Sequence, residues 1–124
     1  MRRSRPQALL IDFTDWERVP PELLAFAAEA HAAGRAVAVV AEASADPGVP
    51  LLDRARLGAA KPTREYFAAA CAALATAADR CLFVDERDWN VRGARAAGLS
   101  AYRWNGPDDL PYLRATLDLP GGRP

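Results

Sequence analysis

The chain has 124 residues, of which 51% are hydrophobic, so it is long enough for one compact core and too short for two ordinary domains. Lysine plus arginine and aspartate plus glutamate each total 16, and a formal net charge of zero gives no electrostatic reason to expect nucleic acid or an anionic membrane as a partner. The first apolar run, 8–11, is interrupted by Asp12, which makes it too short for a signal peptide or a membrane span.

Short apolar runs then alternate with alanine-rich segments of helical period, which predicts repeated β/α units. We expect strands at 8–13, 36–40, 81–84 and 101–104. We expect helices at 22–33, 50–57, 63–75, 89–97 and 109–117. Pro20 and Pro21 open the first helix, Gly34 ends it, and Asp88 can cap the fourth. The predicted fold class is α/β, with a three-layer, doubly wound, Rossmann-like parallel sheet in one domain at 8–117 and flexible termini at 1–7 and 118–124.

The two cysteines, Cys71 and Cys81, form neither a CxxC pair nor part of a Cys/His cluster. This spacing is typical of buried thiols in a reducing compartment rather than of a disulfide framework or a zinc site. We therefore expect a cytoplasmic protein.

Polar residues directly follow three of the predicted strands, at 12–15, 41–44 and 85–88. In a doubly wound sheet, ligands bind at the carboxyl ends of the strands, so these segments are the candidate site. A fourth feature is Lys61, because the other 15 basic residues are all arginine. A compact ammonium suits a single oxyanion, and this favours a functional role for Lys61. The alternative is chance retention at a solvated helix start.

Three segments resemble the motifs of the haloacid dehalogenase-like (HAD-like) hydrolases in order and spacing: LLIDF at 9–13, KPTREYF at 61–67 and LFVDERDWNVRGARAAG at 82–98. The last segment is similar to the family's fourth motif, an apolar strand that ends in paired acids and is followed by asparagine and an Ala/Gly-rich helix. Segment 58–67 resembles the third motif, with its lysine and following proline. The competing reading is a simple Rossmann nucleotide binder, but no GxGxxG follows the first strand.

The resemblance implies a role for each of these residues. Asp12 matches the nucleophile that attacks phosphorus, and Lys61 matches the residue that bridges the nucleophile and the phosphate. Asp85 matches the acid that, with the nucleophile Asp12, holds Mg²⁺, and Glu86 lies beside it as a further carboxylate ligand. Carboxylate oxygens suit a hard dication, and metal and lysine together offset charge in phosphoryl transfer.

The sequence also departs from the family's pattern in two motifs. Thr14 stands where the second, acid–base aspartate is expected, and a hydroxyl cannot protonate a leaving alkoxide near neutral pH. Asp15 is then a candidate for a displaced acid. Strand two is expected to end in Ser or Thr as a phosphate ligand, but Ala41 and Glu42 stand there. Ser44 is a candidate for a shifted substitute, with Thr14 and Lys61 as further anion ligands.

The family's usual cap insertion is missing as well, because only about one helix separates Trp16 from Ala36. Family members without a cap commonly act on large substrates or complete their sites by oligomerising, so the resemblance implies a homo- or hetero-oligomer through the open face. Trp16 and Trp89, both expected in loops at this edge, support an interface. The alternative is local packing of shortened loops.

Three functions from different classes remain open. The first, which we favour, is a HAD-like subunit or pseudoenzyme that works with a partner protein. The second is a slow Mg²⁺-dependent phosphatase that uses Asp12 as nucleophile and Asp15 as acid. The third is elimination or intramolecular displacement of a phosphate or sulfate group, with an anionic small molecule as substrate and Lys61 stabilising the leaving oxyanion.

Overall fold

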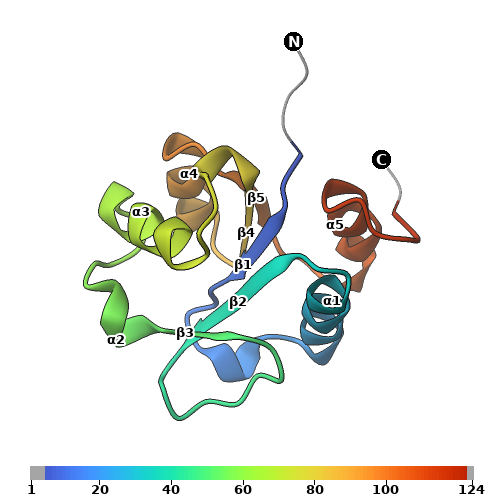
Figure 1. The fold of residues 1–124 in the computed structure, drawn as a ribbon, viewed down its shortest axis with the longest axis horizontal. Helices are drawn as coiled ribbons and strands as arrows, with labels where there is room; N and C mark the ends of the chain where they lie inside the picture. Colours follow the sequence, from blue (N-terminus) through green and yellow to red (C-terminus); the bar gives the residue numbers. More distant parts are fainter. Residues whose placement is uncertain (1–4, 123–124) are drawn as a thin grey trace.

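Five parallel strands form the central sheet of the computed structural model, which describes residues 5–122 (Figure 1). The strands are β1 (Ala8–Ile11), β2 (Ala36–Ala41), β3 (Leu51–Asp53), β4 (Cys81–Asp85) and β5 (Ser100–Arg103). Their order across the sheet is β3-β2-β1-β4-β5, and every neighbouring pair is parallel. The chain is a single α/β domain of the Rossmann-like type, which confirms the predicted fold class.

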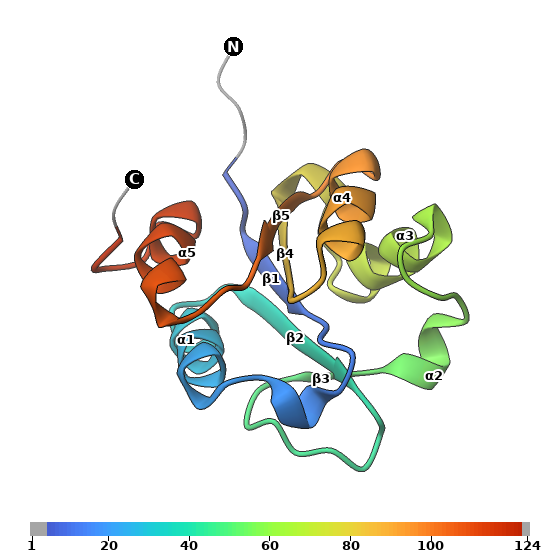
Figure 2. The ribbon, with the colours of Figure 1, turned by 180° about the vertical axis from the view of Figure 1, so that it is seen from behind.

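Helices cover both faces of this sheet. They are α1 (Pro21–Ala32), α2 (Arg54–Leu57), α3 (Arg64–Ala73), α4 (Asp88–Ala96) and α5 (Leu110–Thr116), with 3₁₀ turns η1 (Trp16–Arg18), η2 (Ala78–Arg80) and η3 (Pro107–Asp109). Figures 1 and 2 show α1 and α5 on one side of the sheet and α3 and α4 on the other. Among the described helices, none has both the length and the apolar character needed to cross a bilayer.

The alternation of side chains along β1 supplies both halves of the core. Leu9 and Ile11 belong to the cluster under α1 and α5, and Ala8 and Leu10 belong to the cluster under α3 and α4. This division follows from the two-residue period of a strand. Because both faces are covered, the strand is continuously apolar, as expected for a parallel sheet between helices.

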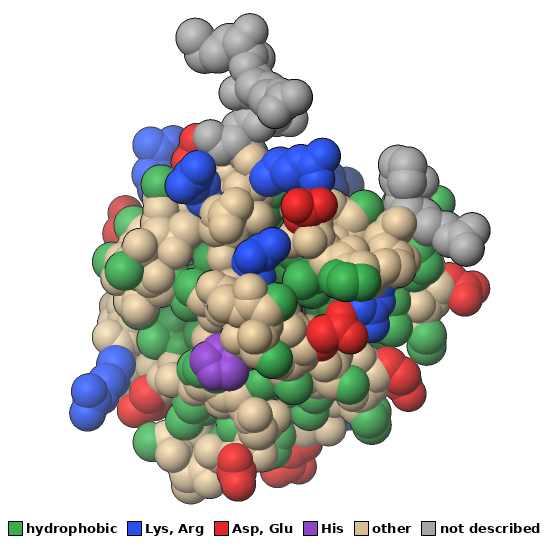
Figure 3. All heavy atoms as spheres, turned by 45° about the vertical axis from the view of Figure 1, so that its right-hand side comes forward, with side chains coloured by type: hydrophobic (Ala, Val, Ile, Leu, Met, Phe, Trp, Pro, Cys, Tyr) green, Lys and Arg blue, Asp and Glu red, His purple; other side chains and the backbone are tan. Residues whose placement is uncertain are grey.

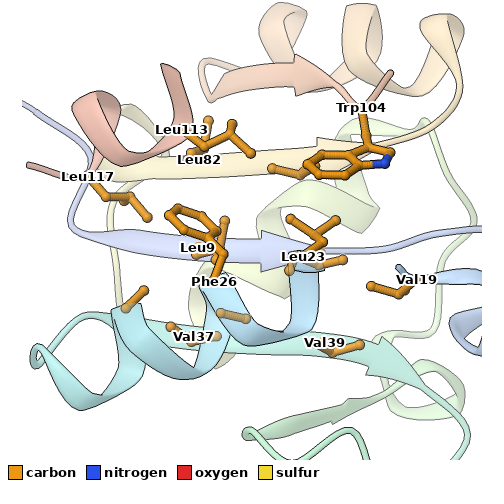
Figure 4. Packing of buried hydrophobic residues seen from close by; sticks show 14 of the residues in the cluster. Leu9, Val19, Leu23, Phe26, Val37, Val39, Leu82, Trp104, Leu113 and Leu117 are labelled. Atoms are coloured by element: carbon orange, nitrogen blue, oxygen red, sulfur yellow. The ribbon is translucent and has the colours of Figure 1, made fainter. Parts of the chain in front are cut away.

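Large side chains from α1 and α5 close the first of these clusters. Figure 4 shows Phe26 of α1 against Leu9 and Leu23 of α1 further along β1 toward Trp104, with Leu113 and Leu117 on the α5 side. Burying each such side chain stabilises the fold by about 1.5–3 kcal/mol relative to exposure. The rigid scaffold that results holds the strand ends in fixed positions. Cys71 and Cys81 belong to the opposite cluster as buried free thiols, as predicted.

Strand β3 corrects one prediction, because 50–57 was expected to be a short helix. Only Arg54–Leu57 is helical, and the three preceding residues pair with β2 at the edge of the sheet. Three residues are too few for hydrophobic periodicity to identify, and their strand conformation is set by the neighbouring strand. The consequence is that Arg54 directly follows a strand end.

The described core also extends beyond the predicted boundaries of 8 and 117. Leu119 is buried and its backbone N–H donates to the carbonyl of Arg114. Pro6 is buried, and the N–H of Gln7 donates to the carbonyl of Arg80 at 2.7 Å. The predicted flexible segments therefore include packed residues, while 1–4 and 123–124 lie outside the described part of the chain.

On the face drawn in Figure 3, basic and acidic side chains lie interspersed among apolar ones, and no one sign of charge dominates that face.

Candidate functional site

The parallel pairing of β1 and β4 brings two aspartates to the same edge of the sheet. Ile11 pairs with Val84, and the N–H of Asp12 donates to the carbonyl of Val84 at 3.2 Å. Asp12 and Asp85, each at the carboxyl end of its strand, are both completely buried, with 0% exposure. Buried carboxylates need charged or hydrogen-bonding partners, so the surrounding residues determine what this edge can do.

Lys61 lies between the two carboxylates. Its Nζ donates to Asp85 Oδ2 at 2.7 Å and to the backbone carbonyl of Asp12 at 2.6 Å, and it lies 3.4 Å from Asp12 Oδ1. An ammonium has three N–H donors, and hydrogen bonds to Asp85 Oδ2 and the Asp12 carbonyl use two of them, while Asp12 Oδ1 is an ion-pair contact without a hydrogen bond. Lys61 therefore joins the two acids with two of its three donors, and its anion-binding role stays a prediction.

The remaining hydrogen bonds of Asp85 come from the turn and helix that follow it. Its Oδ1 accepts from the N–H of Arg87 at 2.8 Å, and its Oδ2 accepts from Asn90 Nδ2 at 3.1 Å. Burial raises the pKa of the Asp85 carboxyl above its usual range. The hydrogen bond and the positive charge of Lys61 lower this pKa, but the effect of burial is larger. Both oxygens of Asp85 are thus engaged within the protein.

Asp12 is held by two residues that the sequence reasoning missed. The Tyr66 hydroxyl donates to Asp12 Oδ2, and Arg54 Nη2 lies 2.9 Å from Asp12 Oδ1. The Arg54 and Lys61 contacts to Oδ1 are ion pairs by distance, but no well-aligned hydrogen bond reaches that atom. Burial, together with the charge and hydrogen bond of Asp12, raises the pKa of Tyr66, so the phenol keeps its proton.

Signals for both missed residues exist in the sequence. Arg54 directly follows β3, so recognising that strand would have placed it at the carboxyl edge with the other candidates. Tyr66 lies five residues after Lys61, in the first turn of α3, where Thr63 caps the helix by accepting from its N–H at 3.2 Å.

Thr14 and Glu86 bind each other rather than the Asp12 carboxylate. Glu86 Oε1 accepts hydrogen bonds from the backbone N–H and the hydroxyl of Thr14, both at 3.0 Å. Arg87 Nε donates to the Thr14 hydroxyl oxygen at 2.9 Å. The Glu86 carboxylate is therefore occupied outside the pair of buried aspartates.

Asp15 and Ser44 are not brought into this cluster. Asp15 is exposed, and its Oδ1 caps the η1 turn by accepting from the N–H of Glu17 at 3.1 Å. Ser44 is exposed in the loop after β2, and no hydrogen bond of the described residues connects it to Asp12, Lys61 or Asp85. Their predicted roles as displaced acid and shifted phosphate ligand do not fit these positions.

A pocket of about 420 Å³ opens at this edge of the sheet. It is lined by Thr14, Arg54, Ala59, Ala60, Lys61, Tyr66, Arg87, Trp89 and Asn90. Three of these side chains are cationic and none is acidic, because the two aspartates lie beneath the pocket wall. Trp89 is 57% exposed, and the Arg87 guanidinium carbon lies 5.2 Å from the centre of its ring. The pocket therefore presents positive charge and one aromatic surface.

Comparison with known proteins identifies the fold. No family model and no curated protein matches the chain. Among solved structures, an uncharacterized protein from Corynebacterium glutamicum is similar, with a TM-score of 0.77, 23% identity and coverage of 94% of this chain and 98% of that one. The core domain of a protein from Streptococcus pneumoniae, assigned as a phosphoglycolate phosphatase, has a TM-score of 0.62 and 16% identity over 93% of this chain and 99% of its own.

A dehalogenase solved with an intermediate complex matches 69% of this chain and 44% of its own, with a TM-score of 0.59 and 20% identity. The chain has the haloacid dehalogenase-like fold. At identities below 25%, these similarities establish the HAD-like fold alone, and the function must be argued from the site.

The residues at this edge of the sheet do not fit the Mg²⁺ ion that the resemblance implies. Of the predicted ligands, Asp12 and Asp85 lie at the same edge but are bridged by Lys61, while Glu86 is bound to Thr14, and the described residues contain no group of three or more His, Cys, Asp or Glu side chains placed to hold a metal. A Mg²⁺ ion bound at roughly 2.1 Å from Asp12 Oδ1 would lie within about 5 Å of Arg54 Nη2, since that nitrogen is itself 2.9 Å from the oxygen. The guanidinium would repel the dication, and no step is assigned to a metal.

Gly93 allows α4 to approach the loop that carries Lys61. A Cβ atom at Gly93 would lie 2.5 Å from Pro62 Cβ and 3.0 Å from the Pro62 carbonyl oxygen. We expect Gly93→Ala to lower the free energy of unfolding by about 1 kcal/mol or more, because overpacking outweighs alanine's better helix propensity. Denaturant unfolding would measure the loss. Arg92→Ala, an exposed position in the same helix, is the control, and equal stability of both variants would contradict the prediction.

Proposed function

We propose that this HAD-like protein is a non-hydrolytic subunit that binds an anionic ligand at the carboxyl edge of its sheet and works with a partner protein. The observation that carries the proposal is the state of Asp12, which is completely buried with Tyr66 on one carboxylate oxygen and Arg54 and Lys61 beside the other. A nucleophile needs an accessible oxygen aligned with the phosphorus atom. Asp12 offers none.

The acid–base chemistry of hydrolysis lacks a residue as well. Thr14 occupies the position of the second aspartate, and its hydroxyl hydrogen-bonds with Glu86 and Arg87. Loss of a general acid–base group alone costs on the order of 10² to 10⁴ in rate. The blocked nucleophile and the missing acid act on different steps, and together they favour binding over turnover.

The open edge of the sheet supports a partner. The described chain places no cap over the 420 Å³ pocket, and the exposed Trp89 lies on the pocket's rim. A large exposed aromatic beside cations is typical of the centre of a protein interface, where Trp and Arg contribute most of the binding energy. We propose that the partner, either a second copy or another protein, covers Trp89 and the pocket.

Hydrolysis assays test the proposal directly. The expected result is that purified wild type releases phosphate from an aryl phosphate and an acyl phosphate no faster than Asp12→Asn, with Mg²⁺ or with a chelator. The substitution is nearly isosteric, and it removes only the nucleophilic charge. Mass spectrometry after incubation with acyl phosphate is expected to find no phosphate adduct on wild type.

The other two candidate functions would appear as distinct outcomes. Turnover that is present in wild type and lost in Asp12→Asn would establish a slow phosphatase, and its sensitivity to Asp15→Asn would show whether that exposed acid takes part. Release of phosphate or sulfate that survives in Asp12→Asn but disappears in Lys61→Ala would establish elimination or displacement. Either outcome would replace the proposed non-hydrolytic role.

A further inference from the structure

We infer that Arg54 and Arg87 form a metal-independent site for an oxyanion, such as the phosphate or sulfate group of a small molecule, with Arg54 acting as the resident cation on Asp12. The inference rests on the proposed function, since it names the ligand class and the binding groups of the same pocket. It differs from the role that the resemblance implied, in which Lys61 and Mg²⁺ hold the anion.

A single nitrogen attaches Arg54 to the edge of the sheet. Arg54 Nη2 lies 2.9 Å from Asp12 Oδ1 and donates to the carbonyls of Phe13 at 3.2 Å and Val40 at 3.5 Å. These oxygens belong to the ends of β1 and β2, so the guanidinium is fixed across two strands. No hydrogen bond among the described residues uses Nε or Nη1 of Arg54.

The remaining donors of Arg54 are placed at the pocket. The side chain lines the pocket and is 35% exposed, whereas the Lys61 side chain is 11% exposed and two of its donors are used by Asp85 Oδ2 and the Asp12 carbonyl. A guanidinium that is neutralised on one side by a buried carboxylate and open on the other can donate to an anion without moving.

Arg87 supplies the second set of donors. Its Nε donates to the Thr14 hydroxyl, and its guanidinium lies over the Trp89 ring, which together fix the position of the side chain. Both arginines line the pocket, and no acidic side chain does. Two planar guanidinium groups present paired N–H donors, the geometry that matches phosphate and carboxylate oxygens.

The balance of charge disfavours a dication at the two aspartates. Asp12 and Asp85 carry two negative charges, and Lys61 and Arg54 carry two positive charges at distances of 2.7–3.4 Å from the carboxylate oxygens. This buried group is neutral before any ligand arrives, so a dication has no uncompensated negative charge to neutralise. Arg87 adds positive charge at the rim, although Glu86 lies 3.9 Å from its Nε.

Calorimetric titration with inorganic phosphate, in a buffer of constant ionic strength that contains a chelator, tests the site. Wild type is expected to bind phosphate, and replacing the chelator with Mg²⁺ is expected to change the affinity by less than about twofold. Arg54→Gln and Arg87→Gln are each expected to weaken binding by about tenfold or more, because each loses charge-assisted hydrogen bonds. Arg56→Gln is the matched control, since Arg56 is two residues from Arg54 and 87% exposed.

Binding of Mn²⁺ to wild type, followed by electron paramagnetic resonance, supplies a second readout. Wild type is expected to leave Mn²⁺ free in solution. The inference is overturned if wild type does not bind phosphate with the chelator present, or if Arg54→Gln binds phosphate as tightly as wild type. It is also overturned if Mn²⁺ binds to wild type and this binding is lost in Asp12→Asn. Circular dichroism verifies that Arg54→Gln is folded. If it is not folded, the same titration is made with Arg54→Lys, which keeps the positive charge beside Asp12 but lacks the paired N–H donors. Turnover is not measured in these experiments, so phosphatase activity would overturn the proposed function and leave this inference standing.

Discussion

Replacing Lys61 with methionine is expected to lower the free energy of unfolding by about 3–5 kcal/mol, the cost of leaving buried charge without its partner. Methionine keeps the length of the side chain but removes the ammonium that joins Asp85 Oδ2 at 2.7 Å to the Asp12 carbonyl at 2.6 Å. Both aspartates are completely buried, so water cannot replace the lost donor without opening the site. Denaturant unfolding at neutral pH measures the loss.

Two further variants separate charge from packing in this prediction. Lys61→Met combined with Asp85→Asn is expected to recover part of the loss, because the asparagine carries no charge to compensate. Arg56→Met, at an exposed arginine, is expected to change stability by no more than about 0.5 kcal/mol. A loss below about 1 kcal/mol in Lys61→Met would mean that the two carboxylates are not held together by this lysine.

Tyr66→Phe is expected to lower the free energy of unfolding by about 1.5–3 kcal/mol, the usual contribution of a hydrogen bond to a charged group. The substitution removes one oxygen and leaves the ring, which stacks edge-on against Phe67 with centroids 5.0 Å apart, in place. Asp12 then loses the donor to its Oδ2. Tyr112→Phe, at a half-exposed tyrosine, is the control for loss of a hydroxyl, and an equal effect of both substitutions would contradict the prediction.

The same variant has a defined pH dependence, since burial raises the pKa of Tyr66 in the folded state. Below the ordinary tyrosine pKa of about 10, the phenol is protonated in both states and its contribution is fully present. Above that pH the unfolded state loses the proton first, so wild-type stability falls by up to about 1.4 kcal/mol per pH unit from this group. Tyr66→Phe is expected to lack this part of the decline, and parallel stability curves above pH 10 would contradict it.

Much of the fold could be predicted from the sequence because its main signals are local. The continuously apolar runs at 8–11 and 81–84, each followed by an aspartate, identified two central strands and their carboxyl ends. Proline and glycine marked the limits of α1. The order and spacing of the segments that contain Asp12, Lys61 and Asp85 also marked these three residues as candidates for one site. Parallel pairing then suffices to bring the two strand ends together, which is why these residues were found.

Only the tertiary structure decided how those side chains are used. The sequence could not show that Arg54 reaches Asp12, because the two residues are 42 positions apart. Arg54 is brought to the sheet edge by the three-residue strand that precedes it, and the pairing of that strand with β2 is itself a tertiary contact. Nor could it show that the Glu86 carboxylate binds Thr14 or that Lys61 donates hydrogen bonds to both Asp85 Oδ2 and the Asp12 carbonyl. A residue's type and position limit what it can bind, but which partner it binds depends on distances across the sheet edge, and these exist only after folding.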